Sequence, residues 1–272
     1  MFSKMRIGTP LGDLTVFTNH EDWRRLVETL FVVSRELNVP LPKALYYGPS
    51  DYTNLLPPTD YTDRHLTYRG TSSIMEYWYR DQMILFFGSL EESPANQVKA
   101  LLAHELIHHS DNLNNLNITA YALPCTYFCN EDTGQNCVTF FKICLDAFRN
   151  TSVNSRLPPF YQEICNNDAL EHVREAMKEI KKTKDHEQRL LALFYSAIIA
   201  SSLIPFKEIE KEARGMLKTA VKESPAFEEF SIFIQKSVQE IFGKKPSIAI
   251  EEAYIQSLKS LLCSNMKQIF KQ

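Results

Sequence analysis

Residues 94–109 read PANQVKALLAHELIHH, and they predict the helix that decides the fold. Apolar residues recur there at helical spacing, at Val98, Leu101, Leu102 and Leu106. Ser93 is a candidate N-cap, and a proline at the first helical position is favourable because that position has no helical partner for an N–H. Residues 83–88, MILFFG, indicate a short buried strand just before this helix. We therefore expect a strand, a loop and a helix in succession.

Two histidines of this helix, His104 and His108, stand four residues apart. This spacing puts both imidazoles on one helix face, where they can bind the same zinc ion. Glu105 directly follows the first histidine, so its carboxylate can take a proton from a metal-bound water whose pKa zinc lowers toward about 7. His109 points about 100° away from His108 and is not expected to reach the ion. The pattern HExxH is typical of zinc-dependent peptide hydrolysis, and we expect one Zn²⁺ per chain.

The segment from about residue 83 to residue 111 resembles the zincin metallopeptidases. The sequence HELIH is similar to the corresponding sequence of clostridial neurotoxin light chains and of several short bacterial and mitochondrial zinc peptidases. The resemblance implies that Glu105 is the general base. An exposed strand edge near residues 83–88 could then hold an extended peptide across the metal.

A tetrahedral zinc needs a third protein ligand, which in zincins comes from a later helix. The extended pattern HExxHxxGxxH is poorly supported, because Leu113 and Asn114 occupy the positions where its last histidine would be. A glutamate ligand is favoured instead. Three candidates remain open, namely Glu171, Glu187 and Glu131.

The first of these candidates opens a stretch, EHVREAM at 171–177, that resembles the Glu-x-x-x-Glu-Ala-Phe helix of anthrax lethal factor-type peptidases. The resemblance implies that Glu171 binds zinc, that Glu175 supports it and that Tyr161 stabilises the oxyanion. The chain departs from that pattern, since Tyr161 lies ten residues before Glu171 and His172 and Arg174 replace apolar positions. A solvated, salt-bridged helix face is the alternative interpretation of these residues.

Asp111 lies on the helix face of both motif histidines and could orient a ligand imidazole, although a polar residue near a helix C-terminus is the simpler interpretation. Four cysteines fall close together without a CxxC pair, at positions 125, 129, 137 and 144. A structural zinc site, disulfides and reduced thiols all remain open for them.

The whole chain predicts an α+β fold, with a small mixed sheet packed on the HExxH helix and a mostly helical C-terminal half. Strands are indicated near residues 5–7 and 14–17, a helix over 21–38 and a loop over 42–63. Residues 74–79 are ambiguous, and 65–69 favour a strand. We expect a metallopeptidase domain over residues 1–204 and a helical extension over residues 205–272.

Composition limits the partners of the chain. A net charge of −3 and a pI near 6.2 argue against nucleic acid. The longest apolar run, Leu190 to Ile204, is shorter than the roughly 20 residues that span a bilayer. Residues 1–10 lack a long apolar stretch, so we expect a soluble protein that is cytoplasmic or exported without the usual signal peptide.

Together these patterns predict a zinc endopeptidase acting on a protein or peptide substrate, with Glu105 and Tyr161 in catalysis and His104, His108 and Glu171 at the metal. One alternative is a bacterial effector or toxin-type protease specific for one host protein. The other is a helical binding or scaffolding protein, with a vestigial metal site and a partner protein on its C-terminal helices.

Overall fold

The computed structural model describes residues 3–9, 12–49, 75–78, 81–116 and 134–269. Its packing divides the chain into two compact units. Unit 1 takes residues 1–61, 72–119 and 157–165, and unit 2 takes 62–71, 120–156 and 166–272. The α+β class is confirmed, with a small mixed sheet and a mostly helical C-terminal half. The predicted domains, residues 1–204 and 205–272, stay a prediction.

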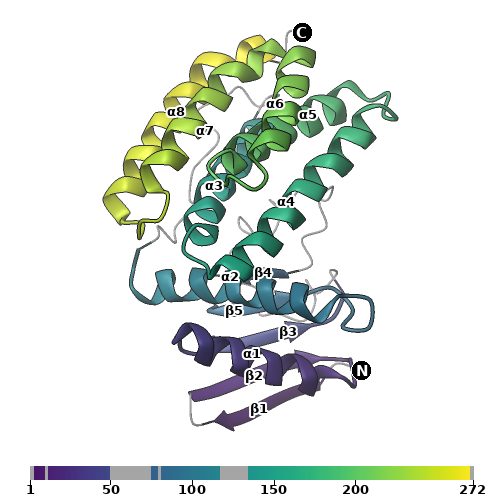
Figure 1. The fold of residues 1–272 in the computed structure, drawn as a ribbon, viewed down its shortest axis with the longest axis vertical. Helices are drawn as coiled ribbons and strands as arrows, with labels where there is room; N and C mark the ends of the chain where they lie inside the picture. Colours follow the sequence, from purple (N-terminus) through teal and green to yellow (C-terminus); the bar gives the residue numbers. More distant parts are fainter. Residues whose placement is uncertain (1–2, 10–11, 50–74, 79–80, 117–133, 270–272) are drawn as a thin grey trace. The chain divides into compact units, whose positions relative to one another are not determined.

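Unit 1 contains a five-stranded sheet in the order β1-β2-β3-β5-β4 (Figure 1). The strands are β1 (Ser3–Thr9), β2 (Gly12–Thr18), β3 (Ala44–Tyr47), β4 (Met75–Trp78) and β5 (Met83–Phe86). β2, β3 and β5 run parallel, whereas β1 pairs with β2 and β4 pairs with β5 in antiparallel register. β4 is therefore an edge strand, and β5 lies inside the sheet.

The two central strands β3 and β5 are buried on both faces, which explains why their sequences read as continuous apolar runs. Leu45 and Ile84 belong to the main core cluster on one face. Tyr46 and Leu85 belong to a second buried cluster on the opposite face. The predicted loop over residues 42–63 is wrong at β3, because parallel pairing with β2 and β5 makes Ala44–Tyr47 a strand. The predicted strand over 65–69 lies outside the described residues.

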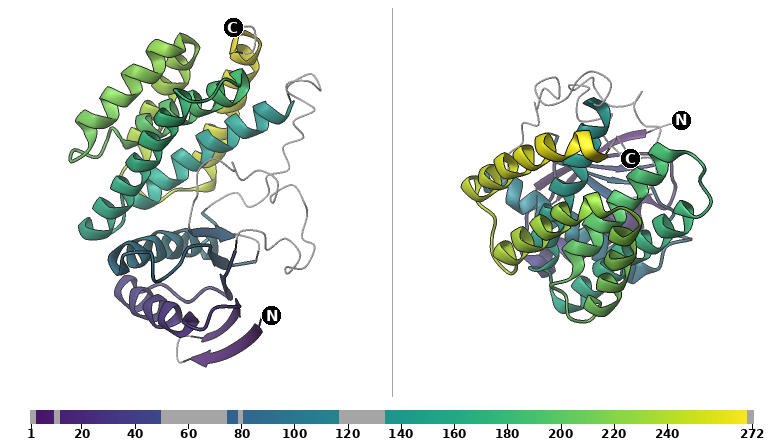
Figure 2. Two further views of the ribbon diagram at one scale, coloured as in Figure 1. Left: turned by 90° about the vertical axis from the view of Figure 1, so that its right-hand side faces the viewer. Right: turned by 90° about the horizontal axis from the view of Figure 1, so that it is seen from above.

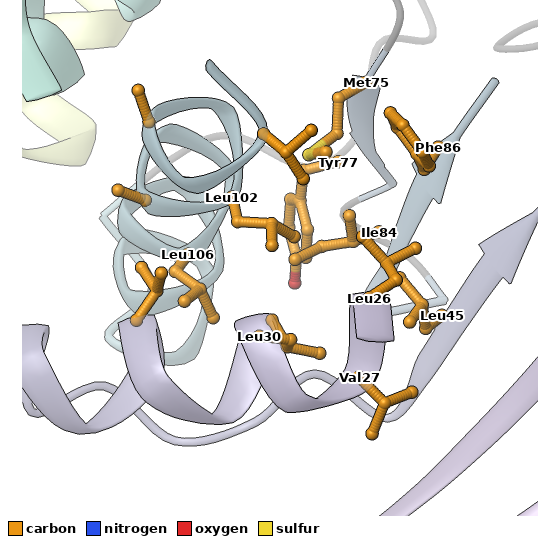
Figure 3. Close-up of a cluster of buried hydrophobic side chains, with 14 of the residues drawn as sticks. Leu26, Val27, Leu30, Leu45, Met75, Tyr77, Ile84, Phe86, Leu102 and Leu106 are labelled. Carbon is orange, nitrogen blue, oxygen red and sulfur yellow. The ribbon is translucent and has the colours of Figure 1, made fainter. Parts of the chain in front are cut away.

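Helices α1 (Trp23–Leu37) and α2 (Ala95–Leu113) pack on the main core face of the sheet. Figure 3 shows Leu30 of α1 and Leu102 of α2 among the buried side chains next to Ile84. α1 ends at Asn38, whose left-handed backbone (φ 52°) lets its N–H reach the carbonyls of the last turn. α2 is the predicted motif helix, but Pro94 and not Ser93 takes its N-cap position.

Unit 2 is helical in the described residues (Figures 1 and 2). Its helices are α3 (Gly134–Asn154), most of α4 (Pro159–Ile180), α5 (His186–Leu203), α6 (Glu210–Glu223), the short 3₁₀ helix Pro225–Phe227, α7 (Glu228–Ile241) and α8 (Ile248–Ile269). α4 begins at Pro159, because proline is well tolerated in the first turn of a helix.

The centre of unit 2 is an aromatic cluster around Phe194 of α5. The Phe194 ring stacks on Phe140 of α3 with ring centroids 4.0 Å apart, and it meets Phe227 and Phe230 edge-on. All four side chains are almost fully buried. Offset-stacked and edge-to-face pairs of this kind stabilise a core beyond the area that they bury.

Candidate metal centre

Two neighbouring faces of α2 carry the polar side chains of the motif. His104, His108 and Asp111 repeat at i, i+4 and i+7 on one of them, which we call the metal face. The same spacing one residue later defines the second face, which we call the strand face because it is turned toward β4. It carries Glu105, His109 and Asn112. The two faces have different chemistry.

On the metal face the two motif histidines point their Nε2 atoms at each other. His108 Nε2 lies 3.0 Å from His104 Nε2. Two nitrogens bound to one tetrahedral zinc, each at about 2.0–2.1 Å, lie roughly 3.3 Å apart. The donor set therefore fits a zinc ion with little movement, and the same contact can serve as an N–H···N hydrogen bond when no metal is bound. His108 is buried, and His104 is partly exposed.

The ligand atoms of His104, Glu105 and His108 all lie within 4.8 Å of one another. Within the part of the chain that the structure describes, this is the group of His, Cys, Asp and Glu side chains that could hold a metal ion. The structure thus brings together the three residues that the motif predicted. It does not identify the metal.

Glu105 is buried, and burial raises the pKa of its carboxyl well above the usual value. The negative charge of Glu76 on β4 raises this pKa further, whereas the backbone N–H of Tyr77 donates to the carboxylate and lowers it. A carboxylate in such surroundings is a stronger base than an exposed glutamate. A divalent cation on the adjacent histidines would act in the opposite direction, because positive charge favours the ionised form.

Glu171, the predicted third ligand, lies on α4 in unit 2 and does not belong to this group. Its carboxylate accepts a hydrogen bond from Arg174, and Lys178 Nζ lies 3.9 Å away. Arg174 also donates to Glu212 of α6 at 2.7 Å, and its contact with Glu171 lowers the pKa of Glu171. These contacts match the salt-bridged helix face given above as the alternative interpretation.

The group that could hold a metal does not include Glu187 of α5. Glu187 is exposed in the first turn of α5, and Glu131 lies outside the described residues. The third ligand stays a prediction. Glu175, which the resemblance made a supporting residue, is exposed on α4.

Tyr161, the predicted oxyanion donor, lies in the first turn of α4 and in the core of unit 1. Its hydroxyl donates to the Glu36 carboxylate of α1. Burial raises the pKa of Tyr161 to about 12, and Glu36 contributes to the rise. The hydroxyl is therefore a neutral donor that already has an acceptor, and its role in catalysis stays a prediction.

Asp111 is buried on the metal face, as its spacing predicted, and its role in orienting an imidazole stays a prediction. Among the cysteines with described side chains, Cys144, Cys165 and Cys263 form no disulfide. Cys125 and Cys129 lie outside the described residues. The predicted alternatives for the cysteine cluster are thus not separated.

A buried polar network on the strand face was not predicted from the sequence. His109 Nε2 lies 3.1 Å from the carbonyl oxygen of Leu41, so this nitrogen must carry the hydrogen. His109 Nδ1 then accepts the hydroxyl hydrogen of Tyr77 at 2.8 Å, and Asn112 Nδ2 donates to the Tyr77 oxygen at 3.1 Å. The apparently surplus histidine of the motif therefore joins α2 to β4. The sequence signal for this network was limited to the histidine at 109, directly after His108.

The network predicts an acid-sensitive fold for unit 1. Burial lowers the pKa of His109 to about 4, and an unfolded histidine has a pKa of about 6.5. Because the unfolded chain binds this proton at a higher pH, the free energy of unfolding decreases as pH falls from 6.5 to 4. At pH 5 the expected loss is about 2 kcal/mol. Urea unfolding of metal-free protein at pH 7.5 and pH 5 measures it.

Tryptophan fluorescence suits this measurement, because Trp23 and Trp78 both belong to unit 1. A His109→Gln variant serves as the reference, since glutamine does not titrate and other groups contribute equally in both proteins. An equal dependence on pH in the wild type and in this variant would show that the network does not hold a neutral histidine.

The sheet corrects the expected substrate edge. β5, which covers most of residues 83–88, is flanked by β3 and β4 and has no open edge. Among the described strands β1 and β4 lie at the two edges, and β4, the segment that the sequence left ambiguous, is the edge strand that contacts α2.

Comparisons with protein-family models, with curated proteins and with solved structures found no match in any of the three. No helix within the described residues combines the length and the apolar character needed to cross a membrane. Fold and site together define an α+β chain with a possible metal-binding group, which is compatible with a metalloprotease.

Proposed function

We propose that this chain is a zinc-dependent endopeptidase. The observation that carries the proposal is the convergence of His104 Nε2 and His108 Nε2 at 3.0 Å, with the buried Glu105 carboxyl within 4.8 Å of both ligand atoms. Two imidazoles beside one basic carboxylate are what metal-assisted hydrolysis requires. A pair of histidines that binds a metal without catalysis would not need that carboxylate.

His104 and His108 would hold the ion, and we propose Glu171 as the third ligand, with Glu187 and Glu131 as alternatives. When bound, zinc supplies a Lewis acid that makes water more acidic and polarises a carbonyl. Glu105 takes a proton at its carboxylate and delivers it to the leaving amine. Tyr161 or another donor would stabilise the oxyanion.

Metal removal and restoration test this function. Purified protein is incubated with a peptide library, and products are identified by mass spectrometry. We expect about one zinc per chain, loss of cleavage after treatment with a chelator and recovery when zinc is added back. A His104→Ala variant should lose the metal, whereas His186→Ala, which changes an exposed histidine of α5, should keep it.

Cleavage that persists without metal, or a purified protein that binds no zinc, would overturn the proposal. Zinc binding without any cleavage would favour the binding or scaffolding alternative. The range of cleaved peptides separates a general endopeptidase from a protease with one protein substrate.

A further inference from the structure

One residue of the edge strand is joined to every polar residue of the strand face of α2. Tyr77 of β4 contacts Glu105 through its backbone N–H, and it contacts His109 and Asn112 through its hydroxyl. Glu105, His109 and Asn112 follow one another at i, i+4 and i+7. The two attachments of Tyr77 therefore run along a single face of one helix.

The hydrogen bonds of the Tyr77 hydroxyl are buried, and their donors and acceptors are defined. Tyr77 and His109 are 7% and 1% exposed. Since His109 donates to Leu41, it can only accept from Tyr77, and the Tyr77 oxygen then accepts from Asn112. Figure 3 shows the Tyr77 side chain between Leu102 of α2 and Ile84 of β5. Packing and hydrogen bonds thus fix the same side chain.

The backbone attachment concerns a short edge strand. β4 has four residues, and among the described strands it pairs with β5. Alternate residues of an edge strand direct their backbone groups away from the partner strand. A strand of four residues needs further attachment to keep the Tyr77 N–H in place.

We propose that Tyr77 is a positioning residue for Glu105: its hydroxyl, anchored on His109 and Asn112, holds its own backbone N–H against the Glu105 carboxylate. The inference deepens the proposed function and rests on it where Glu105 acts as the general base. Without the anchor, β4 can shift and the carboxylate loses its fixed donor. A misplacement of about 1 Å at a reacting group can cost up to about a hundredfold in rate.

Amide hydrogen exchange tests the geometry without any substrate. We expect a Tyr77→Phe variant to exchange the amide at position 77 about tenfold faster or more, because its hydrogen bond to Glu105 is no longer held. Exchange at Ile84, on the interior strand β5, should stay unchanged. A Glu105→Ala variant should speed exchange at position 77 as well, whereas Glu105→Gln keeps an acceptor and should not.

Tyr46→Phe is the matched control for this variant. Tyr46 is a buried tyrosine of β3 whose hydroxyl donates to the carbonyl oxygen of Pro49 at 2.9 Å. It lies on the opposite face of the sheet, so its variant should leave exchange at position 77 unchanged. Asn112→Ala removes one of the two anchors and should change exchange in the same direction as Tyr77→Phe, but by less.

Kinetics provide the second readout. For Tyr77→Phe we expect kcat to fall about tenfold, with KM and zinc content unchanged, and Tyr46→Phe should keep the wild-type kcat. The inference is overturned if exchange at position 77 does not change in Tyr77→Phe, or if kcat does not fall. A similar fall in Tyr46→Phe would also overturn it. If the wild type cleaves no peptide, the proposed function fails and the exchange experiment alone decides whether Tyr77 positions Glu105.

Discussion

A Glu105→Gln variant should lose hydrolysis and keep its zinc. Glutamine has nearly the same volume and can still accept the hydrogen bond from the Tyr77 N–H, so the helix and the two histidines should stay in place. An amide cannot take up the proton that the reaction releases. We expect kcat/KM to fall about a thousandfold, within the range for loss of a general base. Peptide cleavage and zinc content are measured on the same preparation.

Two further variants separate the possible causes of this loss. Glu92→Gln changes an exposed glutamate just before α2 and should leave both quantities unchanged. His104→Ala removes a donor of the metal face and should lose both. If Glu105→Gln cleaves peptides at the wild-type rate, the carboxylate is not the base and the assignment of the site is wrong.

The second large effect is expected in unit 2, where an ion pair joins α3 to α8. Arg149 and Glu251 are 5% and 1% exposed and are hydrogen-bonded to each other. Replacing Glu251 with alanine removes this carboxylate from a buried guanidinium, which typically costs about 3–5 kcal/mol. We expect that loss in the free energy of unfolding. Urea unfolding followed by circular dichroism measures it, because the helical content lies mostly in unit 2.

A double variant distinguishes loss of the partner from loss of packing. Arg149→Met combined with Glu251→Leu replaces both charges with apolar side chains, and it should recover most of the stability that Glu251→Ala loses. The exposed pair of Arg214 and Glu210 on α6 is the surface control. Glu210→Ala should cost no more than about 0.5 kcal/mol. If Glu251→Ala lowers the free energy of unfolding no more than Glu210→Ala does, the buried pair does not stabilise unit 2 by the expected amount.

Local patterns explain which parts of the fold could be predicted. β1, β2, α1 and α2 follow from periodicity, because in each the more buried side chains recur at regular spacing within a single segment. β3 could not be recognised in the same way. Its residues Ala44–Tyr47 stand among prolines and tyrosines, and they form a strand only because β2 and β5 pair with them from distant parts of the chain.

The same distinction applies to the site. His104, Glu105 and His108 lie within one turn of one helix, so their spacing alone predicted that they meet. Tyr77 lies 32 residues before His109, and Glu36 lies 125 residues before Tyr161, so neither contact has a local signature. Glu171 shows the converse. The sequence around it resembles a peptidase family and predicted a metal ligand, yet the nearest partner of the Glu171 carboxylate is Arg174, three residues away.

The central claim is that the metal face of α2 holds a zinc ion. A crystal structure of the zinc-loaded protein, with anomalous diffraction recorded on both sides of the zinc absorption edge, tests it directly. We expect one anomalous peak about 2.0–2.1 Å from both His104 Nε2 and His108 Nε2, with a carboxylate oxygen as the third ligand. A peak elsewhere, or protein that remains free of zinc at the two histidines, would contradict the account.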